Sequence, residues 1–175
     1  GMRRGELSAL RWPDLDLDRG TARVNWTLST REKGWRLAEP KTKASRRTVP
    51  LADDLIDVLR AHRLRQTEER LAEGPAWADH GFVFATSRGT PVNGRNLTGH
   101  FHRILGWAGL DRMRFHDLRH SAATLLVADG EELKVVSELL GHSRYGITAD
   151  LYVAAMPERQ EAAGRRMGRL LSVGE

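Results

Sequence analysis

Two basic side chains in the segment FHDLRHSAA could together handle a phosphate group. His116 and Arg119 lie three residues apart at the beginning of a predicted helix, so they share one face beside backbone N–H groups that lack an intrahelical acceptor. A guanidinium can hold two oxygens of one phosphate, and an imidazole can exchange a proton with it near neutral pH. The segment therefore predicts an anion site, although a capping histidine beside a surface arginine would give the same pattern.

The same segment does not favour a metal site. His120 follows His116 by four residues, a spacing that suits two metal ligands, but the glutamate of an HExxH pattern is absent and Arg119 would repel a cation. The chain also has no cysteine, which excludes disulfides, thiolate catalysis and cysteine-based zinc or iron–sulfur sites. The sequence therefore predicts no metal.

Tyr152 is the candidate nucleophile. It comes ten residues after His142, which follows the glycine that ends a predicted helix. A tyrosine pKa of about 10 leaves the hydroxyl protonated at neutral pH, so nucleophilic attack needs cationic neighbours. A tyrosine without them would instead pack its ring and expose its hydroxyl.

Two further segments could supply that positive charge. PKTKASRRTVPL is rich in basic residues, and GMRRGEL carries a carboxylate three residues after an arginine that it could orient. The residues concerned are Lys41, Lys43, Arg46 and Arg47 in the first segment and Arg3 and Glu6 in the second. Neither segment is diagnostic alone, because a solvated surface hairpin is the default interpretation of the first.

The elements that must position these residues are mostly helices. Hydrophobic spacing and capping residues predict helices over residues 5–12, 53–73, 93–108, 116–128, 131–140, 147–155 and 157–171. β-Branched runs at residues 21–28 and 46–51, around a turn at Gly34, predict a small antiparallel sheet, and residues 82–84 could add a short strand. Leu55, Leu59 and Leu64 are predicted apolar positions of the longest helix.

The composition is that of one soluble globular domain. The 175 residues are 40% hydrophobic and 29% charged, without an apolar stretch near the roughly 20 residues of a membrane span and without a secretory signal. Lys and Arg number 28 against 23 Asp and Glu, and this net charge of +5 suits a nucleic-acid partner. We therefore expect a protein of a reducing compartment that does not enter a membrane.

Together, the four segments resemble the active-site motifs of the tyrosine recombinases, also called the phage integrase family. GMRRGELSALRW is similar to the first arginine box, PKTKASRRTVPL to the lysine hairpin, FHDLRHSAATLL to the HxxR box, and ELLGHSRYGITADLYVA to the LGH box with its tyrosine. The resemblance implies an α+β fold that is mainly α, the integrase or DNA breaking-rejoining fold. This fold is a helical catalytic domain with a small antiparallel β-sheet. The resemblance also implies that residues 1–175 form a single catalytic domain.

The resemblance further implies a mechanism without metal or cofactor. Tyr152 attacks a DNA phosphate, forming a 3′-phosphotyrosyl bond and releasing a 5′-hydroxyl that later rejoins the DNA. Arg3 and Arg119 hold the non-bridging oxygens, His142 adds a hydrogen bond, and Glu6 braces the first arginine.

Proton transfer and DNA contact fall to the remaining basic residues. Lys41 protonates the departing 5′ oxygen and is preferred to Lys43 because it occupies the lysine of the KT pattern, while His116 assists proton transfer. The residues expected to contact DNA are Lys43, Arg46, Arg47 and Arg144. The expected partner is double-stranded DNA, bound by a homo-oligomer, a tetramer in the full-length protein, in the bacterial cytoplasm.

Family members normally carry, ahead of the first arginine box, the beginning of its helix and a separate helical domain that clamps the DNA. Neither precedes Gly1, so we expect an N-terminally truncated domain with Arg3 near a frayed end and with weak, salt-dependent DNA binding. Two alternatives stay open, a catalytically silent DNA-binding fragment and a metal-independent ribonuclease that uses two histidines and a lysine.

Overall fold

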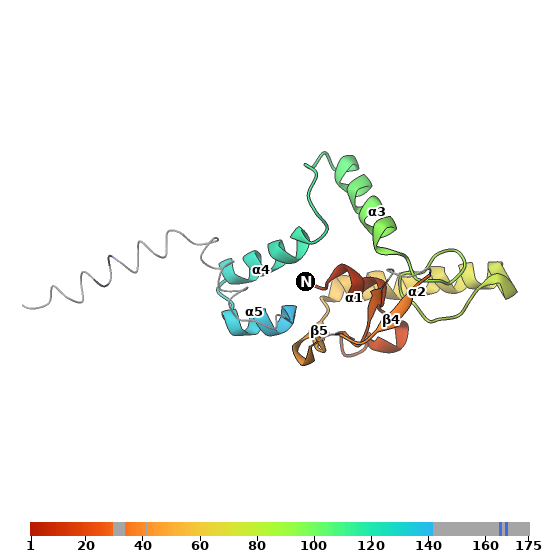
Figure 1. The fold of residues 1–175 in the computed structure, drawn as a ribbon, viewed down its shortest axis with the longest axis horizontal. Helices are drawn as coiled ribbons and strands as arrows, with labels where there is room; N and C mark the ends of the chain where they lie inside the picture. The colour runs from red at the N-terminus through yellow and green to blue at the C-terminus, as the bar shows by residue number, and fades with distance from the viewer. Residues whose placement is uncertain (30–33, 41, 142–164, 166, 168–175) are drawn as a thin grey trace, which may run out of the picture.

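Helices dominate the fold and accompany a small amount of antiparallel sheet (Figure 1). The computed structural model describes residues 1–29, 34–40, 42–141, 165 and 167. Its helices are α1 (Arg4–Ser8), α2 (Asp53–Glu73), α3 (Gly94–Trp107), α4 (Asp117–Ala128) and α5 (Leu133–Leu140), with the short 3-10 helices η1 (Trp12–Asp14), η2 (Lys43–Ser45) and η3 (Gly74–Ala76). Its strands are β1 (Leu15–Asp16), β2 (Thr21–Arg23), β3 (Thr27–Ser29), β4 (Arg36–Ala38) and β5 (Thr48–Pro50). The predicted fold class is confirmed.

The predicted strand pairing forms, but it is divided between two sheets. β2 lies between β1 and β5 in an antiparallel three-stranded sheet, while β3 pairs with β4 in a sheet of its own. The run over residues 21–28 is therefore not one strand. Asn25 interrupts it, and the side-chain amide of this residue donates to the buried carboxylate of Asp14 at 2.9 Å. Gly34 lies two residues before β4 and has a φ of 104°, a value that glycine adopts without strain, as the predicted turn requires.

α1 is shorter than the predicted helix over residues 5–12. A helix does not pass through Pro13, because proline has no N–H and its ring clashes with the carbonyl of the residue four positions earlier. That residue is Ala9, which caps the C-terminal end of α1. The chain then forms an antiparallel bridge between Arg11 and Phe82. The predicted short strand at Phe82 is reduced to this bridge.

α2 has the predicted length but buries a different face. Leu59 is buried, whereas Leu55 and Leu64 are 45% and 68% exposed, so two of the three predicted apolar positions were wrong as core positions. Gln66 is buried in their place, and its amide donates to the carbonyl of Val83 at 3.0 Å. The buried face thus contains a polar side chain that satisfies a backbone carbonyl, a position that hydrophobic spacing does not reveal.

The apolar core of the described chain includes two clusters of buried side chains. The first joins the segment after α1 to α2, and the second joins α4 to α5. Their buried members are Leu10, Leu59 and Val83 in the first cluster and Ala123, Val127, Val136 and Leu140 in the second. The second cluster fixes α5 against the helix that carries Arg119.

The helices predicted over residues 93–108, 116–128 and 131–140 are confirmed, one with a shifted start. Asn93 caps α3 by accepting from the backbone N–H of Asn96 at 2.9 Å, and His116 is the N-cap residue of α4. α5 begins at Leu133, because Glu132 is extended and serves as its N-cap. Figure 1 shows α4 and α5 side by side, with α3 projecting away from them.

The two last predicted helices, over residues 147–155 and 157–171, lie outside the described residues except for Arg165 and Met167, which are helical. Among the described helices, none combines the length and the apolar character that crossing a membrane requires.

Neighbouring valines on α5 test the importance of the second cluster. Val136 is fully buried and Val135 is 45% exposed, so alanine at the buried position removes core contacts that alanine at the exposed position does not. Both changes share the same gain in helix propensity. We expect Val136→Ala to lower the free energy of unfolding by about 2 kcal/mol more than Val135→Ala, measured by urea denaturation. Equal losses would show that α5 is not anchored through this face.

Candidate active site

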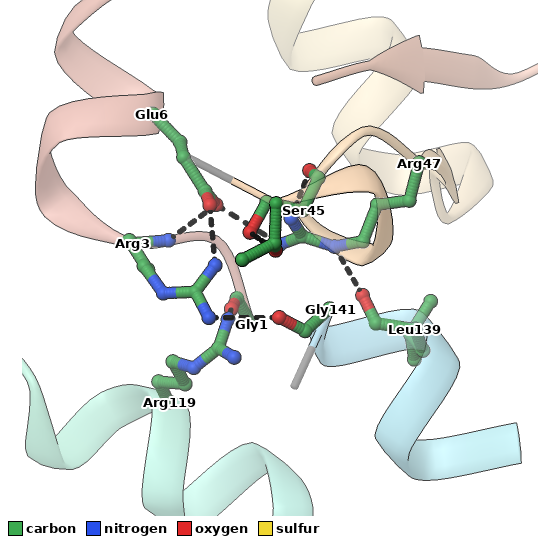
Figure 2. A network of polar contacts seen from close by, with 9 residues as sticks. Gly1, Arg3, Glu6, Ser45, Arg47, Arg119, Leu139 and Gly141 are labelled. Carbon is green, nitrogen blue, oxygen red and sulfur yellow. Dashed lines mark hydrogen bonds and ion pairs between the residues drawn. The ribbon is translucent and has the colours of Figure 1, made fainter. Parts of the chain in front are cut away.

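Four stretches of the chain converge on one group of charged side chains (Figure 2). They are the N-terminal end of α1, the segment from η2 to β5, the first turn of α4 and the C-terminal end of α5. The side chains that they bring together are those of Arg3, Glu6, Arg47 and Arg119. Three guanidinium groups therefore surround one carboxylate, and the group carries excess positive charge.

Glu6 is the common partner within this group. Its side chain is 3% exposed and accepts three hydrogen bonds, from the backbone N–H of Arg3 at 2.8 Å, from the guanidinium of Arg3 at 2.7 Å and from Nη2 of Arg47 at 3.0 Å. Burial by itself would raise the pKa of Glu6, but the hydrogen bonds from Arg47 and Arg3 outweigh it and lower the pKa. The carboxylate is therefore ionised at neutral pH and divides its charge between two arginines.

Arg47 does not occupy the DNA-facing position that the sequence predicts. Its side chain is 6% exposed, and besides Glu6 it binds the carbonyl oxygens of Leu139 at 2.6 Å and Ser45 at 3.2 Å. It thus ties the basic hairpin to α1 and to the end of α5. Arg46, by contrast, is 53% exposed and forms an ion pair with Glu39, as a surface position allows.

Arg3 extends from the start of α1 to the end of α5. Its Nη2 donates to the carbonyl oxygen of Gly141 at 2.8 Å, and its side chain is 37% exposed. Gly141 has a φ of 69°, and a Cβ at this position would lie 2.8 Å from the carbonyl oxygen of Ala44. Glycine is therefore required by both conformation and space. This contact explains the glycine that precedes His142, which itself lies outside the described residues.

Arg119 is the most buried cation of the group. It is 4% exposed, and its Nη1 donates to the carbonyl oxygen of Gly1 at 2.6 Å. Its Nη2 is also buried but has no acceptor among the described residues. Burial, followed by the charges of Arg3 and Arg47, lowers the pKa of Arg119 to about 10, against the opposing effect of Glu6. Arg119 remains charged at neutral pH, and Figure 2 shows that its guanidinium lies beside that of Arg3.

His116 lies at the edge of this cationic group. It is exposed, and its ring meets that of His120 edge-on with 4.9 Å between centroids. Burial of part of the ring lowers the pKa of His116, and the charges of His120, Arg119 and Arg3 lower it further, with Asp117 acting in the opposite direction. Its imidazole is therefore neutral at pH 7 and can accept a proton.

The structure places some of the sequence-predicted residues and leaves others undescribed. It brings Arg3, Glu6 and Arg119 together with His116 beside them, and it buries Arg47 as a brace. Lys43 begins η2. The predicted residues that lie outside the described part are Lys41, His142, Arg144 and Tyr152.

Sequence reasoning missed the acceptors that position the arginines. They are backbone carbonyl oxygens of Gly1, Ser45, Leu139 and Gly141. A backbone carbonyl leaves no signature in residue identity, because every residue has one. The one usable signal was the glycine of the LGH motif, whose missing side chain permits the close approach.

Comparison with known proteins decides how this geometry is classified. The profile of the phage integrase family matches residues 1–159. The chain belongs to the phage integrase family. The predicted family assignment is thus confirmed, and the match includes each of the four segments on which the prediction rested.

Two curated relatives of this phage integrase family member come from bacteria. It is 40% identical over 175 residues to a XerC-like tyrosine recombinase of Caldanaerobacter subterraneus subsp. tengcongensis, with 93% of the chain and 45% of the relative covered. It is 35% identical over 159 residues to an integrase of Streptomyces ambofaciens, with 87% of the chain and 41% of the relative covered. The chain spans less than half the length of either relative.

Solved structures with the same fold include recombinases bound to DNA. The Tn1549 transposon integrase in complex with transposon right end DNA has a TM-score of 0.75 and 24% identity, over 95% of this chain and 55% of that one. The XerH site-specific recombinase in a post-cleavage complex with a palindromic difH substrate has a TM-score of 0.65 and 26% identity, over 93% and 41%. These similarities confirm the predicted integrase-type fold.

A comparison of adjacent arginines tests whether Arg47 is a brace. Arg47→Ala leaves the buried carboxylate of Glu6 with one cation fewer, so we expect unfolding in urea to require about 3 kcal/mol less free energy. Arg46→Ala breaks an exposed ion pair and should cost less than about 1 kcal/mol. Similar losses for the two variants would mean that Arg47 is not the buried, bridging residue described here.

The neighbouring cations give His116 a pH dependence that can be measured. Its pKa should lie below the ordinary value of 6.5, so the neutral imidazole persists to lower pH than in an isolated histidine. Arg119→Gln removes one of the charges that disfavour protonation, and the pKa of His116 should therefore rise. An NMR titration of the imidazole ring measures both values. The same pKa for His116 with and without Arg119 would contradict this electrostatic coupling.

Proposed function

We propose that this chain is the catalytic domain of a site-specific DNA recombinase that cuts and rejoins DNA through a 3′-phosphotyrosyl intermediate. The observation that carries the proposal is the buried Nη2 of Arg119, which has no acceptor among the described residues. A buried N–H group without an acceptor is unfavourable, and a phosphate oxygen would satisfy it. Arg3 is positioned beside it, partly exposed and held by Glu6, so that the two guanidinium groups can bind one phosphate.

Arg3 and Arg119 stabilise the charge that develops on the phosphate oxygens during transfer. Both are held in place before the reaction, Arg3 by Glu6 and Gly141 and Arg119 by burial, so little reorganisation is needed when that charge appears. Burial, followed by the positive charges of Arg3 and Arg47, lowers the pKa of Arg119, and a bound phosphate compensates this excess positive charge. The same excess of positive charge therefore favours both phosphate binding and the stabilisation of the negative charge that develops during transfer.

The bond changes are assigned from the family motifs. The hydroxyl oxygen of Tyr152 forms a bond to phosphorus while the bond from phosphorus to the 5′ oxygen breaks. Neutral His116 takes part in accepting the tyrosine proton, and Lys41 supplies a proton to the 5′ oxygen. His142 donates a further hydrogen bond to the phosphate. In rejoining, a 5′-hydroxyl attacks the tyrosyl phosphate and these proton transfers run in reverse.

The substrate and assembly follow from the same assignment. We propose that the partner is double-stranded DNA and that the full-length protein acts on it as a homotetramer in the bacterial cytoplasm, close to the nucleoid. The net charge of +5 supports DNA as the partner, and the bacterial origin of the relatives supports the compartment.

The two tyrosines of the chain provide a matched test. A nicked suicide substrate in which the released strand is lost should trap a covalent protein–DNA adduct without divalent metal, detected by denaturing gel electrophoresis. The adduct should disappear in Tyr152→Phe and persist in Tyr145→Phe, because only Tyr152 follows the LGH motif at the position of the family's nucleophile.

Other outcomes of this experiment point to different functions. DNA binding without an adduct in any form of the protein would identify a catalytically silent DNA-binding fragment. Cleavage of RNA that depends on the 2′-hydroxyl, with no tyrosyl adduct, would identify a ribonuclease. Loss of the adduct in Tyr145→Phe alone would refute the assignment of the nucleophile.

A further inference from the structure

A second basic site adjoins the Arg3 and Arg119 pair at His116. A cavity of about 760 Å³ lies between the start of α1, helix α3 and the segment that leads into α4. The charged or titratable residues that line it are Arg4, His102, Arg112, Arg114 and His116, and no carboxylate is among its described lining residues. Its walls are therefore cationic, and they come from three parts of the chain.

Two arginines of this cavity have donors to spare. Arg4 is exposed and, within the described part of the chain, gives one hydrogen bond, from Nη1 to the hydroxyl of Thr98 at 3.1 Å. Its side chain lies over Gly94, where a Cβ would come within 2.8 Å of Nε, so the glycine leaves room for it. Arg112 is also exposed and gives one hydrogen bond to a described residue, from Nη2 to Nδ1 of His102 at 3.2 Å. A guanidinium has five N–H donors, so both residues can also bind an anion.

The imidazole of His102 holds Arg112 at the cavity wall. Its Nε2 lies 3.1 Å from the carbonyl oxygen of Met113, and because a carbonyl can only accept, Nε2 carries the hydrogen. Nδ1 is then an acceptor and receives the hydrogen bond from the Arg112 guanidinium. The arginine is therefore fixed by a neutral partner that does not compensate its charge.

Arg114 differs from the other two arginines. It forms a two-pronged ion pair with Asp117, with Nη2 at 2.8 Å and Nε at 3.0 Å from the same carboxylate oxygen. This pairing neutralises its charge and lowers the pKa of Asp117. The net positive charge available to a ligand therefore comes from Arg4 and Arg112.

We propose that this cavity binds a second DNA phosphate, the one adjacent along the same strand to the phosphate held by Arg3 and Arg119. The inference rests on the proposed function. His116 borders the cavity and senses the charges of both Arg3 and Arg119, so the two sites are neighbours. A DNA strand carries a phosphate about every 3.4 Å along the helix axis, which places the next charge beside the first. The guanidinium groups of Arg4 and Arg112, which lie on different walls of the cavity, would bind this second phosphate.

Nucleotides with one and two phosphates test this arrangement without knowledge of the target sequence. Thymidine 3′,5′-bisphosphate presents two adjacent strand phosphates, and the 3′- and 5′-monophosphates present one each. In NMR titrations of the whole chain, the bisphosphate should bind about tenfold or more tightly than either monophosphate, because it engages both sites. The double variant Arg4→Ala, Arg112→Ala should lose this advantage and retain the affinity for the monophosphates.

Matched variants distinguish the possible failures. Arg103→Ala changes an exposed arginine of α3 that does not line the cavity, and it should keep the tenfold advantage. Because Arg4 and Arg112 are exposed, their replacement should leave thermal unfolding unchanged. A double variant that still prefers the bisphosphate, or an unmodified chain without a preference, would overturn the inference. If Arg119→Ala did not weaken binding of the monophosphates, the proposed function itself would fail.

Discussion

The buried carboxylate of Glu6 is the group on which the geometry of the remaining site depends. It is held at the first turn of α1 and neutralises parts of two guanidinium groups, one on its own helix and one on the basic hairpin. An unpaired charge in this position would be strongly unfavourable, so neither arginine can leave without a large loss of stability. Because the pKa of Glu6 is lowered, its stabilising contribution is complete above the ordinary value of 4.5 and is lost as the pH falls through the lowered value.

Charge imbalance follows directly from this arrangement. One carboxylate cannot neutralise the three positive charges of Arg3, Arg47 and Arg119. The role of each arginine depends on the hydrogen-bond acceptors around it. Each of the three side-chain nitrogens of Arg47 donates to Glu6 or to a carbonyl oxygen, so Arg47 holds elements together. Arg119 retains a buried donor without an acceptor among the described residues, so it can bind a ligand. Identical side chains thus perform different tasks because of their surroundings.

The same principle separates the two basic regions around His116. On one side the cations share a buried carboxylate. On the other, among the described residues, Arg4 is hydrogen-bonded to a hydroxyl and Arg112 to an imidazole, neither of which is a carboxylate. Positive charge therefore continues from the Arg3 and Arg119 pair to the cavity beside His116. A polyanion with evenly spaced charges matches such a surface better than a single small anion does.

The sequence alone determined the family, the fold class and the identity of the principal basic residues, because residue type and spacing along a helix are local properties. It also predicted that Glu6 orients Arg3, a contact between residues three positions apart. Tertiary structure decided which arginines are buried. Arg46 and Arg47 are adjacent in a basic run, yet one is exposed and the other is enclosed. The carbonyl oxygens of Leu139 and Gly141 lie more than 90 residues away from the arginines that they bind, and only folding brings them within hydrogen-bonding distance.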